Sequence, residues 1–392
     1  MAKHAFTWRL PPFVLTAGFI FCSSWALGQG TTDALFKLER TALSASLGDG
    51  AAYLQGLHAL GVNPAGLAAN RSGEFLAQYR PLILNTNLTL MGVSHPIGAA
   101  KRTNLGLSYL SLDSSNFDKR DETGRSVGSF KSRDQIIGLH GGWPIAISGG
   151  ADVLFGMSFK IVKKEVDTYN ASTTAMDFGL RGFLGRRPLA LGVALTNVGR
   201  GAVFVKQEVP LPTTLVFSGA YQTGTALTAL VSVSRNIRER INDMTAGMLY
   251  QVTPLLSLRG RYSLPQGALS QGVQNLGAGF GFRVSPGMAF DYAFQPYERA
   301  LQNAGYAGSH IITLTTKFGH QARPSSYHRS RQTGTFNDRT GEGSNFFTIK
   351  RREPAQEKPK KEEKPSKKKK TESYYKSGSQ EWFIIVPQTE NP

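Results

Sequence analysis

A glycine-rich stretch near the start of the chain, residues 58–75 (HALGVNPAGLAANRSGEF), has the composition of a loop that could hold a phosphate group. A phosphate-binding loop also needs a preceding strand and a glycine-rich run that leads into Lys-Ser or Lys-Thr, and this stretch has neither. Asn is a favourable helix N-cap, and Pro fits the first helical turn because its missing N–H needs no partner there. We therefore expect Asn63 to cap a short helix. The residues of this motif are Asn63, Pro64, Ala65, Gly66 and Leu67.

The other residues of catalytic type do not combine into a recognisable active site. His140 stands alone in LHGGW, and no cluster of His, Asp and Glu has the spacing of metal ligands. The G-x-S-x-G motif of a nucleophile elbow is absent, and no set of Ser, His and acid stands out. The single cysteine is Cys22, which lies in a leader that we expect to be removed. We therefore expect no enzymatic activity, no cofactor and no bound metal.

The N-terminus has the three parts of a secretory signal peptide. Lys3 and Arg9 supply a basic region, residues 10–27 are mainly apolar, and residues 26–28 (ALG) give a small-residue end. We predict a signal peptide at residues 1–28. An N-terminal membrane anchor is an alternative, but the prolines at positions 11 and 12 and the short apolar core fit a membrane span poorly. A lipoprotein would need a small residue before Cys22, where this chain has Phe21.

The chain has 392 residues and a formal net charge of +18, which by itself would suggest nucleic-acid binding. An exported protein does not meet chromosomal DNA, so we expect no nucleic-acid partner. After the leader, no run of about 18 apolar residues occurs, which excludes transmembrane helices. A soluble periplasmic protein and a membrane β-barrel remain.

Residues 72–319 alternate between apolar and polar positions in short segments separated by turns. In LLSLRGRYSL (residues 255–264), Leu258 and Tyr262 fall on one face of a strand, and Arg259 and Arg261 fall on the other. About fourteen segments of roughly 9–12 residues occur, the length of a tilted strand that crosses a bilayer. They begin near Glu74, Asn87, Thr103, Asp134, Val153, Thr173, Pro188, Thr213, Ala226, Asp243, Leu255, Val273, Met288 and His310.

This pattern favours a barrel over a soluble β-sandwich. Sandwich strands average only about five or six residues, and their polar faces meet bulk water. Here the polar face is largely Gly, Ala, Ser and Thr, as expected for a wall around a confined lumen. We predict an all-β fold: a transmembrane antiparallel β-barrel of about 14 strands at residues 72–319. A short helical plug precedes it at residues 29–71, where strand alternation is missing.

Six charged residues fall on the lumen face by alternation. We interpret them as a charge-paired network that fills the lumen and holds the plug. A site for a substrate or a lipopolysaccharide-related ligand is the alternative. The six residues are Asp177, Arg181, Arg259, Arg261, Arg283 and Asp291.

Residues 320–392 form a basic, low-complexity tail that includes KPKKEEKPSKKKK and has too few apolar residues to bury a core. We expect this tail to be disordered and periplasmic. Near its end, EWFIIVP is an apolar patch. It is either a remnant without a role or a peptide that docks on a partner by adding a strand or filling a groove. The docking residues would be Trp382, Phe383, Ile384 and Ile385.

Five stretches in the same order resemble the PorV/PorQ outer-membrane protein family, which is related to FadL-like barrels. They are LGDGAAYLQG (47–56), NPAGLA (63–68), LTNVG (195–199), VPLPTTLVFSGAY (209–221) and YAFQPYERALQNAGYAGSHIITLTTKFG (292–319). The resemblance implies a fourteen-stranded barrel in the outer membrane of a Gram-negative cell, partly filled by the plug. Both ends of the barrel sequence would then lie in the periplasm.

Three functions follow as hypotheses. The resemblance implies a non-catalytic component of type IX-like protein secretion or surface attachment. Such a component would contact a translocon or secreted cargo through long loops near residues 113–132 and 198–210. The alternative is a FadL-like transporter of hydrophobic small molecules, with a ligand bound between plug and wall. A third hypothesis is a structural anchor whose basic tail holds the cell wall or a periplasmic partner. Outer-membrane lipid surrounds the barrel in all three.

Overall fold

The computed structural model describes residues 34–98, 103–146, 152–184, 188–204, 206–224, 226–266, 276–297 and 299–319, together with residues 375–376 and 382–383. The predicted signal peptide lies outside the described residues, as do Ile384, Ile385 and most of the tail. Within the tail, β17 (Tyr375–Lys376) pairs with β18 (Trp382–Phe383) in a separate two-stranded sheet.

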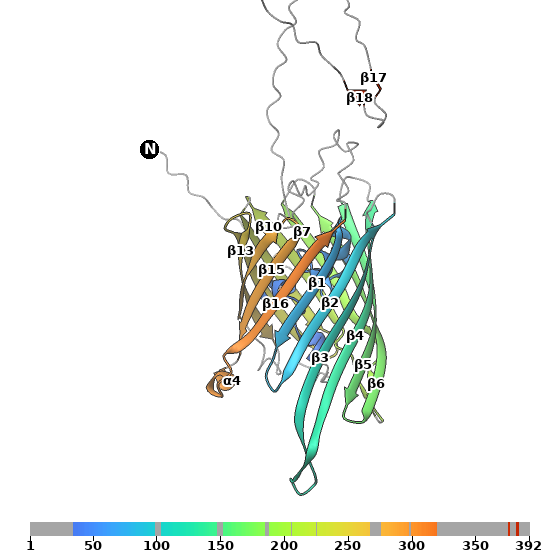
Figure 1. The fold of residues 1–392 in the computed structure, drawn as a ribbon, viewed down its shortest axis with the longest axis vertical. Helices are drawn as coiled ribbons and strands as arrows, with labels where there is room; N and C mark the ends of the chain where they lie inside the picture. The colour runs from blue at the N-terminus through green and yellow to red at the C-terminus, as the bar shows by residue number, and fades with distance from the viewer. Residues whose placement is uncertain are drawn as a thin grey trace, which may run out of the picture. The chain divides into compact units, whose positions relative to one another are not determined.

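Fourteen antiparallel strands close into a barrel, which confirms the predicted fold class (Figure 1). In spatial order the barrel runs β1-β16-β15-β14-β13-β12-β11-β10-β7-β6-β5-β4-β3-β2. The strands are β1 (Gly73–Pro81), β2 (Thr86–Ile97), β3 (Thr103–Arg120), β4 (Ser126–Ala146), β5 (Asp152–Val166), β6 (Tyr169–Phe183), β7 (Leu189–Gly199), β10 (Thr214–Thr223), β11 (Leu227–Asn236), β12 (Ile241–Gln251), β13 (Leu256–Gln266), β14 (Leu276–Ser285), β15 (Met288–Pro296) and β16 (Gly308–Phe318).

Closure depends on the pairing of the first and last strands, which leaves no free strand edge in the wall. Gly73 at the start of β1 lies opposite Phe318 at the end of β16. We call this end of the barrel the entry end, the upper end in Figure 1, and the opposite one the far end. A bilayer tolerates a sheet only when every backbone N–H and C=O is paired in this way.

Side chains alternate across the wall as the sequence pattern predicts. Leu258 and Tyr262 of β13 face outward and are 48% and 47% exposed, whereas their neighbours Ser257 and Ser263 are buried. The outward face therefore offers apolar side chains to lipid, and the inward face is polar. None of the helices in the described part of the chain is long and apolar enough to span a membrane.

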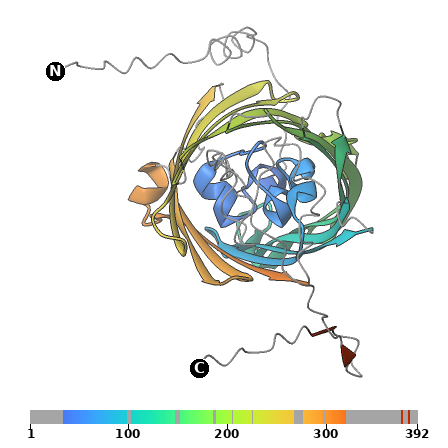
Figure 2. The ribbon, with the colours of Figure 1, turned by 90° about the horizontal axis from the view of Figure 1, so that it is seen from above.

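The segment before β1 lies inside the barrel, where Figure 2 shows its short helices within the ring of strands. We call residues 34–71 the plug. Its elements are α2 (Ala34–Lys37), α3 (Ala42–Leu47) and the 3-10 helices η1 (Gly56–Ala59) and η2 (Pro64–Ala69). Apolar plug residues such as Leu57 and Leu67 pack against wall residues such as Leu90. This burial holds the plug against the wall.

The expectation of a long loop near residues 113–132 was wrong. Strands β3 and β4 continue through this region as a paired hairpin, with only residues 121–125 between them. Phe117 lies opposite Phe130, with ring centroids 5.3 Å apart. Polar residues remain extended here because cross-strand pairs support them outside the lipid zone. The hairpin projects beyond the far end (Figure 1).

Two other far-end connections contain short elements. The segment near residues 198–210 carries a small hairpin of β8 (Ala202–Phe204) and β9 (Gln207–Val209). Helix α4 (Arg299–Asn303) lies between β15 and β16. Both segments are therefore more regular than open loops.

Candidate functional site

Inward-facing glycines of the wall form a seat for the plug backbone. A methyl group added at Gly142 of β4 would lie 2.5 Å from the Ala68 nitrogen, and one at Gly192 of β7 would lie 2.5 Å from the Ala51 carbonyl carbon. Real Cβ atoms essentially never approach another atom within 3.0 Å. The plug therefore touches the wall at positions where only glycine fits. The glycines that meet plug atoms in this way are Gly142, Gly156, Gly179, Gly192, Gly247, Gly277 and Gly279.

Asn63 of the Asn-Pro motif holds the plug against the wall through hydrogen bonds. The Asn63 Oδ1 accepts from the Ala65 N–H at 3.0 Å, as the predicted N-cap requires, although the helix that follows is a 3-10 helix. The Asn63 Nδ2 donates to the carbonyls of Ala51 at 2.8 Å and Leu180 of β6 at 3.0 Å. Asn63 therefore links η2 both to an earlier part of the plug and to the wall. Pro64, Ala65, Gly66 and Leu67 are buried beside it.

Two of the six predicted lumen charges anchor the plug directly. Arg261 pairs with Glu39 of the plug at 2.5 Å, and Arg181, which is fully buried, donates to the Leu54 carbonyl at 2.9 Å. Glu39 also pairs with Arg80 of β1 at 3.3 Å. Burial alone would raise the pKa of Glu39, but the charges of Arg261 and Arg80 outweigh it and lower the pKa to about 2. Glu39 is therefore ionised at neutral pH.

Asp177 has a different role, in an ion pair within the wall. Its carboxylate lies 2.7 Å from the Nζ of Lys160 on the neighbouring strand, and both side chains are fully buried. Lys160 also donates to the Asn197 Oδ1 at 2.7 Å, and Asp177 accepts from the Asn197 N–H at 2.8 Å. Sequence reasoning missed Lys160, although the outward positions of Phe159 and Ile161 place it on the lumen face.

The remaining three predicted charges, Arg259, Arg283 and Asp291, line a cavity between the plug and the wall at the entry end. Its volume is about 130 Å³. The plug contributes residues from Leu43 to Asn70, and the wall contributes the entry-end parts of β12 to β16 and β1. Apolar lining includes Leu43, Tyr53 and Leu249.

Within the cavity, the Nη2 of Arg259 lies 2.6 Å from the Asp291 carboxylate and 3.1 Å from the Ser257 hydroxyl. The His58 ring bonds Thr315 through Nε2 at 3.0 Å, and burial lowers the pKa of His58 more strongly than nearby carboxylates raise it. Glu74 accepts from the Leu57 N–H at 2.8 Å. The polar side chains inside the cavity are thus held in position by these hydrogen bonds and by the ion pair.

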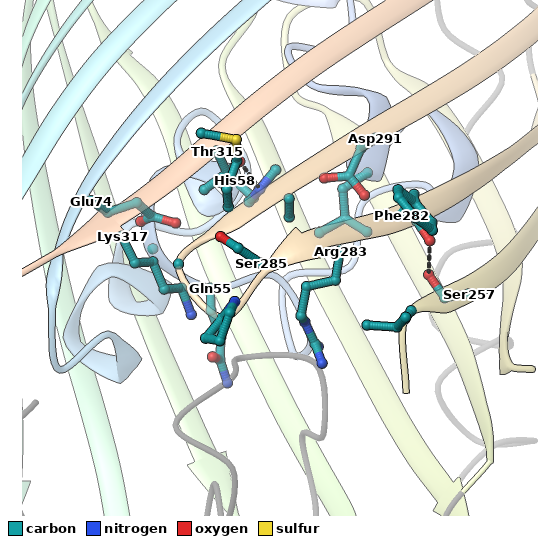
Figure 3. A pocket seen from close by; sticks show the side chains of 18 of the residues that line it. Gln55, His58, Glu74, Ser257, Phe282, Arg283, Ser285, Asp291, Thr315 and Lys317 are labelled. Carbon is teal, nitrogen blue, oxygen red and sulfur yellow. Dashed lines mark hydrogen bonds between the residues drawn. The ribbon is translucent and has the colours of Figure 1, made fainter. Parts of the chain in front are cut away.

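The mouth of the cavity is basic. Figure 3 shows the ends of Lys317, Arg283 and Gln55 on one side of the pocket, and Asp291 and Thr315 on the other. Arg283 donates to the Pro254 carbonyl at 2.8 Å, in the turn between β12 and β13. The turns around Pro254 and Gly287 lie at the entry end, so the cavity opens there.

Nothing in this geometry resembles a catalytic centre. Among the residues that the structure describes, no group of three or more His, Cys, Asp and Glu could hold a metal ion. His140 bonds the hydroxyls of Ser108 and Ser158 at 2.8 Å and 2.7 Å in the buried wall, away from the cavity. The cavity between the plug and the wall is therefore the candidate binding site.

Comparison with solved structures gives the same architecture. A monoaromatic hydrocarbon channel, a deltaS2S3 mutant of TodX, matches with a TM-score of 0.53 and 13% sequence identity, covering 72% of this chain and 99% of that one. The toluene transporter TodX of Pseudomonas putida matches with a TM-score of 0.53 at 12% identity, covering 71% and 99% of the two chains. The toluene transporter TbuX of Ralstonia pickettii gives 0.52 at 13% identity, covering 72% and 100%.

This chain therefore has the barrel fold of the toluene transporters TodX and TbuX. The identities are too low to carry more than the fold. No protein-family model matches the chain, and no curated protein matches it in sequence.

Proposed function

We propose that this chain is a non-catalytic outer-membrane channel for small hydrophobic molecules, the alternative among the hypotheses drawn from the sequence. The observation that carries the proposal is the cavity of about 130 Å³ between plug and wall, with Leu43, Tyr53 and Leu249 in its lining. An apolar cavity of about 150 Å³ engineered into another protein binds benzene. A monoaromatic ring is therefore of the right size.

The names of the fold neighbours support the same proposal. They are called toluene transporters and a monoaromatic hydrocarbon channel, and none of these names describes an enzyme. The neighbours and this chain share a barrel fold, and the cavity beside the plug of this chain has room for an apolar ring. On that basis we propose that this chain, like its named neighbours, lets a molecule with an apolar ring pass.

The seated plug argues against passage of a folded protein through the lumen. The plug is held by glycine contacts, by Asn63 and by the Glu39 ion pairs with Arg80 and Arg261. All of these would have to break before a protein could pass. A small molecule could occupy the cavity beside the plug while all of these contacts stay in place.

We assign the entry end to the periplasm. Outer-membrane barrels have short turns on the periplasmic side and longer connections outside. The entry-end turns at residues 252–255 and 286–287 are short, whereas the far end carries the projecting β3–β4 hairpin and the connection at residues 200–213. The cavity would then be the last binding site before release into the periplasm.

Filling the cavity tests the proposal. Ala289 of β15 lines the cavity, so Ala289→Phe should occupy it and remove most of the uptake of radiolabelled toluene that this chain gives intact cells. Ala229→Phe makes the same change at an exposed position of β11 and is the matched control. Equal uptake by the two variants, with both folded in a heat-modifiability gel, would refute the proposal.

A secretion or attachment component is the second candidate, and the projecting hairpin favours it. Lys119 near the hairpin tip pairs with Asp167 of the β5–β6 turn at 2.5 Å, and the Asp167 N–H donates to the Lys131 carbonyl at 3.0 Å. These contacts brace a surface that a partner protein could bind. Deletion of residues 115–131, followed by affinity capture from native outer membranes, tests this candidate. Loss of a captured translocon or cargo protein would support it, and an unchanged set of proteins would count against it.

A further inference from the structure

The outer face of the wall carries a groove near the far end of strands β5, β6 and β7. It is distinct from the cavity beside the plug, and its volume is about 580 Å³. Ile161 of β5 and Met176 of β6 line it and are 41% and 42% exposed. Both side chains belong to the outward row of their strands, so the groove lies on the side of the wall that faces lipid.

The groove forms where β6 changes from long to short outward side chains. Met176 is followed toward the far end by Thr174 and Ser172, which are the next two outward residues. The neighbouring strand β5 keeps long side chains at the same level, because Ile161 lies opposite Thr174 and Lys163 lies opposite Ser172. The two short hydroxyl side chains therefore leave a hollow beside the longer ones.

The groove also spans the edge of the apolar band of the barrel. Toward the far end, the outward residues of β5 are Met157, Phe159 and Ile161, which are all exposed and apolar, and the next one is Lys163. The outward row of β6 changes at the same level, beyond Met176. One end of the groove therefore lies among apolar side chains, and the other lies where the headgroups of the lipids are expected.

Two cationic side chains flank the hydroxyls at the polar end of the groove. Lys163 lies beside Ser172, and Arg200 follows β7, where its carbonyl accepts from the Thr173 hydroxyl at 2.8 Å. Both cations are exposed, and neither forms an ion pair with another residue of the described ranges. Strands β5 and β7 are two strand spacings apart, about 10 Å. The outward acid Glu165 lies two residues beyond Lys163, farther from the lipid.

We propose that this groove binds a phosphorylated glycolipid of the surrounding leaflet, one with a phosphate at each end of a disaccharide. Lys163 and Arg200 would each contact one phosphate, since both side-chain types bind phosphate groups. The hydroxyls of Ser172 and Thr174 would bond the sugars between them, and the acyl chains would lie along the apolar part of the groove. The entry end is assigned to the periplasm, so this leaflet is the outer one.

The separation of the two cations favours a glycolipid over an ordinary phospholipid. A phospholipid with a single phosphate would neutralise only one of Lys163 and Arg200, and it would leave the hydroxyls between them to water. The proposal goes beyond the channel function, because it needs the assignment of the two ends but neither the cavity nor its ligand.

Native mass spectrometry of the full-length protein in detergent micelles tests this, with lipid A and phosphatidylglycerol as the probes. We expect lipid A to bind more tightly than phosphatidylglycerol. Lys163→Gln and Arg200→Gln should each lower the affinity for lipid A severalfold, and the double variant about tenfold, because each exposed ion pair contributes modestly. Arg238→Gln removes the same charge at an exposed position of the β11–β12 turn and should change nothing.

Thr174→Trp is an independent variant that fills the groove and keeps every charge. It should also weaken lipid A binding, whereas Ala229→Trp, at an exposed position of β11, should not.

Two results would overturn the proposal. One is equal binding of lipid A and phosphatidylglycerol by the native protein. The other is equal lipid A binding by the double variant and Arg238→Gln. Either result leaves the channel function standing, because Ala289→Phe tests that function on the other side of the wall.

Discussion

The close contact between the wall glycines and the plug backbone predicts that Gly192→Ala destabilises the plug. In the native structure, a Cβ at this position would lie 2.5 Å from the Ala51 carbonyl carbon, 2.6 Å from the Ala51 oxygen and 2.6 Å from the Ala52 nitrogen. All three are backbone atoms, so no side-chain rotation relieves the overlap. Ordinary contact begins at 3.4 Å, so the plug or β7 must move by about 0.8–0.9 Å, the difference between the two distances.

This movement breaks hydrogen bonds as well as packing. The Ala52 N–H donates to the Ser218 hydroxyl at 2.6 Å, and the Ala51 carbonyl accepts from Asn63 at 2.8 Å. Overpacking costs about 1–3 kcal/mol, and each hydrogen bond contributes about 0.5–1.5 kcal/mol. We therefore expect the plug to lose about 2–6 kcal/mol of stability, the sum of one overpacking cost and two hydrogen bonds, while the barrel stays closed.

Planar-bilayer conductance and hydrogen exchange measure the two expected effects. Gly192→Ala should raise ion conductance and speed the exchange of plug amides, with the heat-modifiable gel mobility of the barrel unchanged. Gly260→Ala on β13 is the matched control, because a Cβ there would meet nothing within 4 Å. The reasoning is refuted if the two variants have the same conductance and the same exchange rates.

Two further predictions concern the anchors of the plug. Asn63→Ala removes the N-cap and leaves the buried carbonyls of Ala51 and Leu180 without their donor, so the plug should lose about 2–4 kcal/mol of stability. Faster exchange of the plug amides, as expected for Gly192→Ala, checks this prediction. The pKa of Glu39 is about 2 in the folded protein against an ordinary value of 4.5, so its ion pairs stabilise the plug fully above pH 4.5 and lose that contribution as the pH falls toward 2. Limited proteolysis of the plug across this range should show the change in the wild type and not in Glu39→Gln.

Much of the barrel could be predicted because alternate residues of a strand face lipid and lumen. The lipid side requires apolar side chains, whereas the lumen side accepts polar ones. The expected starts at Thr103 and Met288 coincide with the starts of β3 and β15. The pattern weakens where the wall leaves the lipid, since both faces of β3 and β4 then meet water. For that reason the hairpin beyond Asp113 was mistaken for a loop.

The site was less predictable because it depends on partners that are distant in sequence. Alternation places Arg259 and Arg261 on the same inward face, two residues apart. It could not show that Arg261 binds Glu39 of the plug while Arg259 binds Asp291 of the wall. The plug has no repeating pattern, so nothing in the sequence pointed to Glu39 as an anchor.

The neighbours of strand β14 explain why the cavity lies at the entry end of the barrel. The inward residues of β14 include three glycines in alternate positions, and their neighbours change along the strand. A Cβ at Gly277 or Gly279 would meet the plug, whereas one at Gly281 would meet Arg259 and Asp291. Toward the entry end, an ion pair of the wall thus replaces the plug as the neighbour of β14. The cavity therefore lies where the wall no longer touches the plug backbone along β14, which is where the proposed function needs space for a ligand.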